Sequence, residues 1–557
     1  MRVGTRQAGM PRILVSAVLL CVALAGASAA PIVRSPPSPP RAKPPPSPPK
    51  GRPPPSPTKS RSPPLKSGEV PPSPKPPRPP PSPYKLVPKP AASPPPPAPS
   101  ADVTGRITVK DVHRGEGAYI WSLLLPSGNA LRLLQGQPLA VSGELVQAGA
   151  RVALECEFTA DRTACVRVTR VRINRLAAVV PATDIVIKAL TIVTSLTGSC
   201  TRAGARLADV QRAMTPYADF FKSCSYGAMT FDTAGSKVIA AAVPCSASIL
   251  ACNEEAIAAA ADRAARTQLG DDAVDQFTHT SFVLPTGLVN RCGWVGLAEL
   301  PGYRTWFTPD NDGFFHKGTY MQEIVHNFGI YHGWRNGIEY NDASTSMGEG
   351  KACPSAPELW RLGWAKPVAE LNAAGLPEGQ SLQFSLPPTY LSSKNMLKIK
   401  PEWLGDSYSK NVYVALRVAR GGDSDLLPEF REKINVHEVN QRIDSSFTAA
   451  GDPKVSIIAT IADGGSLDLK AYRLMLRFTD LRGDKTLATV RVCRYRSKAT
   501  ECKDADTPDP SPFDDNPPPA DYRWPPPGEA DYAPPPPYEG GWWTLEDYWW
   551  TSEESDD

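Results

Sequence analysis

The residues whose types and spacing could do chemistry lie in one short stretch, residues 322–332. The stretch reads Gln-Glu-Ile-Val-His-Asn-Phe-Gly-Ile-Tyr-His. Residues four apart on a helix share one face, so Gln322 and His326 project toward one point, where both could meet a single metal ion. Between them, Glu323 is placed to act as general base on a water molecule that the metal activates. This spacing predicts metal-dependent hydrolysis.

The residues that follow can complete such a site. Gly329 allows a sharp turn after the helix, so that His332 returns as a further metal ligand. Met347 follows fifteen residues after His332 and is expected to lie beneath the metal as a hydrophobic floor. The chain has 6 His in 557 residues, and two of them fall at this spacing. We interpret His113, His279, His316 and His437 as ordinary structural histidines.

The motif residues carry a family resemblance. Residues 322–332, the later run 340–348 around Met347 and a proline-rich N-terminal rod together resemble the gametolysin family. These are secreted metzincin-type metalloproteases that degrade green-algal cell-wall and matrix glycoproteins. The similarity covers roughly residues 184–500 and is sharpest at 319–364.

The resemblance implies one divalent metal ion, with zinc as the usual metal. It also implies Glu323 as catalytic base and His326 and His332 as metal ligands. Metzincin membership implies that a substrate strand pairs antiparallel with an edge strand, for which we select residues 294–300.

Gln322 departs from the zinc-protease pattern H-E-x-x-H-x-x-G-x-x-H, which has a histidine at this position, although glutamine also occurs here in green-algal members of the family. An amide oxygen is a weaker donor to zinc than an imidazole nitrogen, so we expect lowered zinc affinity. Three outcomes follow from this substitution. Gln322 ligates weakly and another metal such as copper is preferred, a water or another side chain such as His316 fills the gap, or the site is empty.

Elements on either side of the motif must hold it in place. Residues 185–193 form an apolar strand, and apolar side chains between Leu207 and Phe221 mark one helix face. An alanine-rich helix is expected to begin at the cap Asn253. The mixture predicts an α+β fold, with a metzincin-like catalytic domain at residues 183–372.

All-β domains are expected on both sides of the catalytic domain. Five alternating runs between Val103 and Ile173 predict a small barrel or sandwich at 101–182, which is either propeptide-like or accessory. Further strand-like runs predict a β-sandwich-like domain at 373–503.

The chain carries signs of export. Residues 1–29 read as a signal peptide, whose removal takes Cys21 and leaves ten cysteines, an even number that favours disulfides. Local bridges Cys156–Cys165 and Cys493–Cys502 are predicted, because each pair flanks a short polar turn. No second apolar run is long enough for a membrane span, so we expect a secreted protein of the extracellular matrix or cell wall.

The two ends of the chain have extreme compositions. Residues 31–100 hold 32 of the 63 prolines, and twelve basic residues against one acidic residue, Glu69. We predict a disordered polyproline II rod at 30–100 that favours anionic matrix polysaccharide. Residues 504–557 form an acidic, aromatic-rich tail, expected to be disordered. Export and the lack of an aromatic stacking platform argue against nucleic-acid binding.

Two hypotheses follow from the sequence. The first is a secreted metalloendopeptidase that hydrolyses proline-rich cell-wall or matrix glycoproteins, with Glu323 as general base. The alternative is a non-catalytic structural or peptide-binding matrix glycoprotein whose metal site is degenerate at Gln322. Bound metal and peptide hydrolysis distinguish the two.

Overall fold

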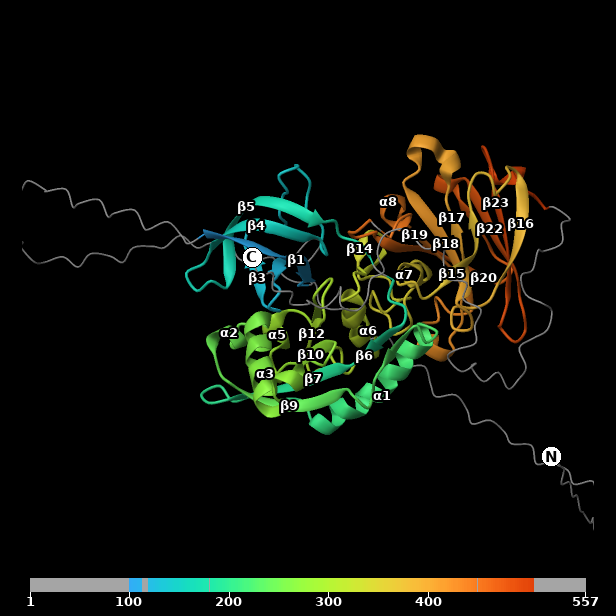
Figure 1. Cartoon of the computed structure of the whole chain (residues 1–557). Helices are drawn as coiled ribbons and strands as arrows, with labels where there is room; N and C mark the ends of the chain where they lie inside the picture. The colour runs from blue at the N-terminus through green and yellow to red at the C-terminus, as the bar shows by residue number, and fades with distance from the viewer. Residues whose placement is uncertain (1–99, 113–118, 180, 448, 505–557) are drawn as a thin grey trace, which may run out of the picture. The chain divides into compact units, whose positions relative to one another are not determined.

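The computed structural model describes residues 100–112, 119–179, 181–447 and 449–504 (Figure 1). Four predictions lie outside the described residues. They concern the signal peptide, the proline-rich rod up to residue 99, the tail from residue 505 and the structural role of His113. The described part of the chain contains both helices and strands, which is consistent with the α+β class.

The N-terminal strands close into a small barrel. Its strand order is β1-β2-β3-β5-β4, and the residues that alternate inward along β4 are buried while their neighbours are half-buried. The strands predicted between Val103 and Ile173 are therefore confirmed, and of the two expected architectures the structure has the barrel. The strands are β1 (Ser100–Asp111), β2 (Tyr119–Leu124), β3 (Ala130–Leu133), β4 (Arg151–Phe158) and β5 (Ala164–Arg175).

The middle of the chain forms a five-stranded sheet of order β11-β12-β10-β7-β9, in which β11 is an antiparallel edge strand and the other strands are parallel. A short parallel pair, β6 and β8, lies outside this sheet. The strands are β6 (Ile185–Ile187), β7 (Ala189–Thr197), β8 (Met229–Phe231), β9 (Lys237–Pro244), β10 (His279–Val283), β11 (Gly296–Ala298) and β12 (Arg304–Phe307). The helices are α1 (Leu207–Cys224), α2 (Ala247–Leu250), α3 (Glu254–Leu269), α4 (Asp271–Val274), α5 (Val289–Cys292) and α6 (Lys317–His326).

This sheet separates two hydrophobic cores. Along β7, Ala189 and Val193 face a core that contains side chains of α1 and α6. The intervening Leu190 and Ile192 face a second core, built with α3. The period-2 alternation of strand side chains thus places α1 and α6 on one face and α3 on the other. The predicted cap of α3 is confirmed, because the Asn253 side chain accepts a hydrogen bond from the Ala256 N–H at 2.9 Å.

The remaining strands build two sheets that share a core. A seven-stranded sheet has the order β14-β13-β20-β19-β18-β17-β15, and a five-stranded sheet has the order β21-β22-β23-β16-β24. Leu416 of the first sheet packs in one core with Leu476 and Val490 of the second. The elements are β13 (Gly333–Arg335), β14 (Ile338–Glu339), α7 (Ala356–Arg361), β15 (Lys366–Leu371), β16 (Gln380–Leu386), β17 (Lys394–Ile399), η1 (Glu402–Ser407), β18 (Lys410–Arg417), η2 (Gly421–Asp423), β19 (Lys433–Asn440), α8 (Gln441–Asp444), β20 (Val455–Ala462), β21 (Ser466–Leu469), η3 (Lys470–Tyr472), β22 (Leu474–Leu481), β23 (Ala488–Arg494), η4 (Ala499–Glu501) and β24 (Lys503–Asp504).

The seven-stranded sheet crosses the boundary that the sequence suggested between residues 372 and 373. Strands β13 and β15 precede that boundary and pair with β20 and β17, which follow it. The metal motif is therefore continuous with the C-terminal sandwich, because β13 begins at Gly333, directly after His332.

Five disulfides join residues of the described ranges. The two predicted local bridges, Cys156–Cys165 and Cys493–Cys502, are confirmed. The other bridges are Cys200–Cys245, Cys224–Cys353 and Cys252–Cys292. Cys224 ends α1 and Cys353 follows the methionine turn, so this bridge ties the motif region to the first core.

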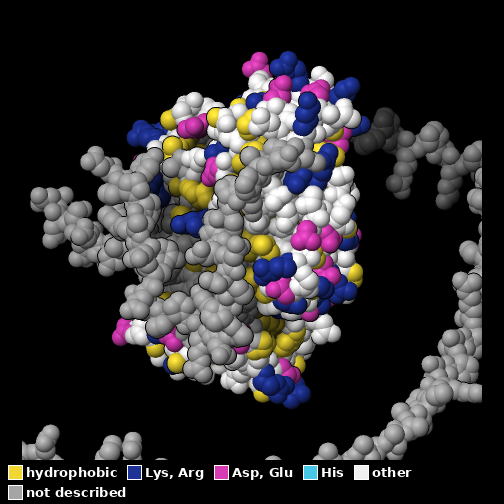
Figure 2. Space-filling view, turned by 90° about the vertical axis from the view of Figure 1, so that its right-hand side faces the viewer, with side chains coloured by type: hydrophobic (Ala, Val, Ile, Leu, Met, Phe, Trp, Pro, Cys, Tyr) yellow, Lys and Arg dark blue, Asp and Glu magenta, His cyan; other side chains and the backbone are white. Residues whose placement is uncertain are grey.

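The surface of the described residues is mixed in charge on the face in Figure 2, where Lys and Arg side chains are interspersed with Asp and Glu. None of the helices in the described ranges combines the length and the apolar character needed to cross a lipid bilayer.

Candidate metal centre

Helix α6 carries the first half of the site. The His316 side chain caps its N-terminus, where its Nδ1 accepts a hydrogen bond from the Thr319 N–H at 3.0 Å. Residues from Gly318 to His326 are all buried, so Gln322, Glu323 and His326 are enclosed by protein. His316 therefore stands at the end of α6 opposite His326 and does not lie among the ligands at the other end.

Strand β11 passes very close to Glu323. A Cβ atom placed on Gly296 would lie 2.4 Å from Oε1 of Glu323 and 2.8 Å from the Thr319 side chain. A side chain at position 296 would therefore displace the Glu323 carboxylate, so glycine lets the edge strand and the helix approach.

A tight turn returns the chain to the site after α6. Gly329 has a φ of +82°, a left-handed conformation that glycine adopts without strain, as expected from the sequence. Nδ1 of His326 donates a hydrogen bond to the carbonyl oxygen of Ile330 at 2.6 Å. This bond places the ring proton on Nδ1 and the lone pair on Nε2, the arrangement that a metal-binding histidine requires.

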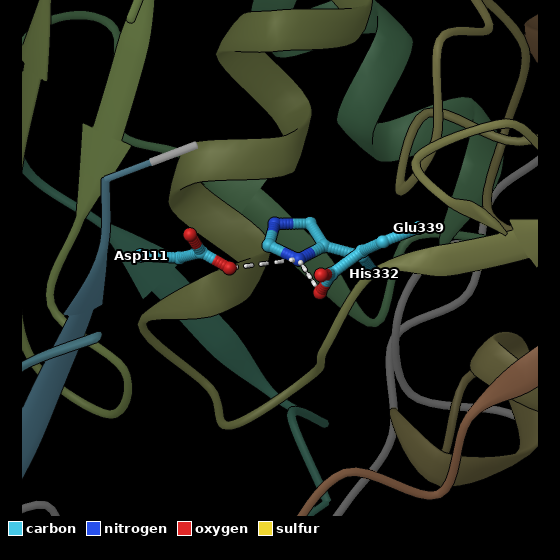
Figure 3. Close-up of side chains that lie close together, drawn as sticks. All are labelled: Asp111, His332 and Glu339. Atoms are coloured by element: carbon cyan, nitrogen blue, oxygen red, sulfur yellow. Dashed lines mark hydrogen bonds and ion pairs between the residues drawn. The ribbon is translucent and has the colours of Figure 1, made fainter. Parts of the chain in front are cut away.

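His332 comes back against His326. The two rings lie 4.5 Å apart, centroid to centroid, with an interplanar angle of 84°. Nδ1 of His332 lies 3.0 Å from Oε1 of Glu339 and 3.5 Å from Oδ2 of Asp111. Figure 3 shows the two carboxylates approaching the His332 ring from two sides. A carboxylate on one ring nitrogen of histidine orients the ring and raises its basicity toward a metal.

Glu323 is buried in a way that a metal cation would explain. Its side chain is 1% exposed, and neither carboxylate oxygen has a hydrogen-bond partner within the described residues. Burial raises the pKa of Glu323 well above its ordinary value, and the charge of Asp111 raises it further. Nε2 of Gln322 is likewise buried without a hydrogen-bond partner there. An enclosed carboxylate that lines one pocket with His326 fits a divalent cation, which would offset the cost of desolvating that carboxylate.

Met347 lies close to His332 through the backbone. Its carbonyl oxygen accepts a hydrogen bond from the Gly333 N–H at 2.7 Å, and its own N–H donates to Thr345 Oγ1 at 3.1 Å. The Met347 side chain is fully buried in the core that also holds α6 residues Ile324 and Val325. The turn at Met347 is thereby attached to the strand that follows His332.

Two of the histidines interpreted as structural, His279 and His437, have contacts away from the His332 cluster. His279 is buried and stacks on Phe328 at 5.6 Å. Nε2 of His437, on β19, lies 3.2 Å from Oδ2 of Asp342, a buried residue shortly before Met347. Neither of them belongs to the cluster around His332.

Three residues of the site escaped the sequence reasoning. Glu339 follows His332 by seven residues, and a carboxylate so soon after the motif was a usable signal. Tyr340, whose ring lies 4.0 Å from the His332 ring, follows it directly. Burial, and then the charges of Asp111 and Glu339, raise the pKa of the Tyr340 hydroxyl. Asp111 ends β1 of the barrel, and nothing in its local sequence connects it to the motif.

Comparison with known proteins places this region in context. Residues 196–470 match the family model described as gametolysin peptidase M11, which confirms the resemblance. A curated protein named "Autolysin", from Chlamydomonas reinhardtii, is 33% identical over 102 residues. That match covers 17% of this chain and 16% of the relative, so it spans about a sixth of each. No solved structure matches the chain.

Proposed function

We propose that this chain, whose residues 196–470 belong to the gametolysin peptidase M11 family, is a metalloendopeptidase that acts on cell-wall or extracellular-matrix glycoproteins. One observation carries the proposal. The carboxylate of Glu323 is buried without a hydrogen-bond partner in the described structure, and it lines one small pocket with His326, whose ring centroid lies 4.5 Å from that of His332.

The proposed ligands are His326 and His332, each through Nε2. The Ile330 carbonyl holds Nδ1 of His326, and Glu339 lies beside Nδ1 of His332, so both rings are oriented before a metal arrives. Gln322 serves as a weak ligand through its amide oxygen. The metal, zinc or alternatively copper, supplies Lewis-acid activation of water and of the scissile carbonyl when bound.

Glu323 carries the proton transfers. Its carboxylate takes a proton from the attacking water and then delivers it to the leaving amine nitrogen. Burial of the carboxylate against β11 keeps competing water away from it.

The substrate strand is proposed to pair with the outer edge of β11, as in metzincin-type proteases. β11 is the edge of its sheet, and its other side pairs with β12. The proposed substrate class is proline-rich matrix glycoprotein. The relative named "Autolysin" and the basic, proline-rich composition of residues 31–100 support a location in the matrix, with anionic polysaccharide as a further partner.

Metal analysis of the purified chain, paired with a peptide-hydrolysis assay in zinc and in copper, tests the proposal. We expect stoichiometric metal that is lost in His326→Ala, and hydrolysis that falls by about 10²–10⁴-fold in Glu323→Ala. The matched control is Glu402→Ala, since Glu402 is an exposed carboxylate in η1, outside the motif. Unchanged hydrolysis in Glu323→Ala, or none with any metal, would falsify the proposal.

A second function is favoured by Gln322. If the weak ligand leaves the site without metal, the chain is a peptide-binding matrix glycoprotein. Gln322→His distinguishes the two functions, because it restores an imidazole at the deficient position. Activity gained from an inactive parent supports the binding protein, whereas a parent that is already active supports the peptidase.

A further inference from the structure

The residue that follows the metal ligand His332 is fixed by its close surroundings. The Gly333 N–H donates a hydrogen bond to the Met347 carbonyl at 2.7 Å. A Cβ atom placed on Gly333 would lie 2.8 Å from the Thr345 side chain and 3.2 Å from Cβ of Asp342. The backbone directly after His332 therefore packs against the turn that contains Met347.

A buried carboxylate of helix α7 holds this turn. Oε2 of Glu358 accepts hydrogen bonds from the Thr345 hydroxyl at 2.5 Å and from the Ser355 N–H at 2.6 Å. The Thr345 hydroxyl oxygen in turn accepts a bond from the Met347 N–H at 3.1 Å. Both Glu358 and Thr345 are fully buried. A series of hydrogen bonds thus runs from α7 through the turn to the N–H of Gly333.

A histidine of the C-terminal sandwich reaches the same turn. Nε2 of His437, on β19, lies 3.2 Å from Oδ2 of Asp342. The other carboxylate oxygen of Asp342 accepts a hydrogen bond from the Ser344 N–H at 2.8 Å. Asp342 is fully buried and His437 is 1% exposed. Because polar groups interact more strongly away from water, this buried pair ties the start of the turn to β19.

The geometry of β19 directs His437 away from the core of the sandwich. Successive side chains of a strand point to opposite faces. Val436 packs in the core between the two C-terminal sheets, whereas Val439 packs in the core that contains side chains of α6. His437 shares the face of Val439. The pairing of β19 with β20 also shifts register between Val436 and His437, and such irregularities can re-aim a side chain next to an active site.

One sheet supports both ends of this network. Strand β13 begins at Gly333 and pairs with β20, and β20 pairs with β19, which carries His437. Helix α7, which carries Glu358, packs on β18 and β19 (Figure 1). A functional side chain keeps its geometry when the packing and hydrogen bonds of neighbouring elements hold it. The turn and the segment after His332 both have this support.

We infer that the C-terminal sandwich positions the metal ligand His332, with His437 and Glu358 as the positioning residues. The inference rests on the proposed metal site. His437 holds Asp342 and Glu358 holds Thr345, and the turn that contains them holds the backbone directly after His332. Both residues act through the turn and not as metal ligands. The sandwich is then a working part of the metal centre.

The test removes each positioning side chain in the full chain and compares it with a conservative replacement. His437→Ala and Glu358→Ala remove the contacts. His437→Gln keeps an N–H donor, and Glu358→Gln keeps an oxygen acceptor. Thr345→Val removes the linking hydroxyl at nearly constant volume, so it provides the comparison if an alanine variant does not fold. Asp444→Ala is the structural control, because Asp444 is also buried and its hydrogen-bond partners lie outside the turn.

The readouts follow the metal ligand rather than overall stability. Zinc affinity is measured by chelator competition, and the absorption spectrum of the cobalt-substituted chain reports the ligand geometry. In the metal-free chain, nuclear magnetic resonance of isotope-labelled histidine rings reports the surroundings of His332. The chain has 6 His, so its ring signals can be assigned by substitution.

We expect His437→Ala, Glu358→Ala and Thr345→Val to weaken zinc binding by roughly 10- to 100-fold, to change the cobalt spectrum and to shift the His332 ring signals. The two glutamine variants should recover most of the affinity, and Asp444→Ala should match wild type in all of these readouts.

Alanine and valine variants that match Asp444→Ala in zinc affinity, cobalt spectrum and ring signals overturn the inference. A wild-type chain that binds neither zinc nor cobalt refutes the proposed metal centre. The inference is still tested in that case, because the ring signals of the metal-free chain report whether the turn positions His332.

Discussion

Two buried carboxylates in this molecule have opposite surroundings. Asp444, in the C-terminal sandwich, is 3% exposed, and Glu323 in the metal centre is 1% exposed. Asp444 accepts hydrogen bonds from Asn411 at 2.6 Å and Tyr413 at 2.9 Å, and Lys398 lies 3.0 Å away. Glu323 has no hydrogen-bond partner among the described residues, and the nearby charge is the like charge of Asp111.

The difference separates a structural group from a functional one. Burying a charge is costly unless partners offset the loss of water, and Asp444 has those partners in the folded chain. Glu323 lacks such partners, so burying its charge lowers the stability of the folded chain unless a cation or a proton binds there. Active sites commonly hold such groups, because the same imbalance shifts a pKa toward its catalytic use.

The largest expected effect concerns Asp444. Replacing it with alanine leaves Lys398 buried without its partner and should lower the free energy of unfolding by about 3–5 kcal/mol. Zinc affinity should not change. Chemical denaturation measures the first quantity, with the exposed Asp463→Ala as a control expected within about 0.5 kcal/mol of wild type. Equal stability of the two variants would mean that Asp444 is not structurally important.

Removing the metal should lower the stability that depends on the metal centre, independently of the contacts around Asp444. A ligand present at a hundred times its dissociation constant stabilises the folded state by about 2.7 kcal/mol, and chelation should remove that amount. The thermal midpoint of the wild type and of Asp444→Ala should both fall on chelation. His326→Ala should show no shift. A chelator-sensitive His326→Ala protein would place the metal elsewhere.

Replacing Glu323 with Gln should change the free energy of unfolding in the opposite direction to Asp444→Ala. In the metal-free protein near neutral pH, losing an unpaired buried charge should raise the free energy of unfolding by about 1–3 kcal/mol. Denaturation in the presence of a chelator measures this. A loss of stability as large as that of Asp444→Ala would show that Glu323 is paired in the folded protein.

The smallest expected effect is a difference between wild type and Glu323→Gln in how folding stability depends on pH. Burial raises the pKa of Glu323, so the folded state retains its proton to higher pH than the unfolded chain, whose value is about 4.3. The resulting stability is complete below the unfolded pKa and is lost as pH rises through the folded one. Metal-free wild type should therefore lose stability over this window more steeply than Glu323→Gln. Parallel curves would contradict the raised pKa.

Local patterns in the sequence carried much of the fold. Alternation between Val103 and Ile173 predicted the strands of the barrel, and the cap Asn253 predicted the start of α3. The same reasoning placed a boundary after residue 372, inside a continuous sheet. Alternation identifies a strand but not its partner, and β15 pairs with β17 only through tertiary packing.

By itself the sequence determined the spacing of Glu323, His326 and His332, because helical periodicity and a glycine turn are local properties of the chain. Tertiary structure alone decided that Glu339 orients His332, that six further cysteines pair as they do, and that Asp111 of a separate barrel enters the site. The reason is physical. These contacts depend on which surfaces pack together, and that choice is made by burial and charge pairing across the whole chain rather than by any local pattern.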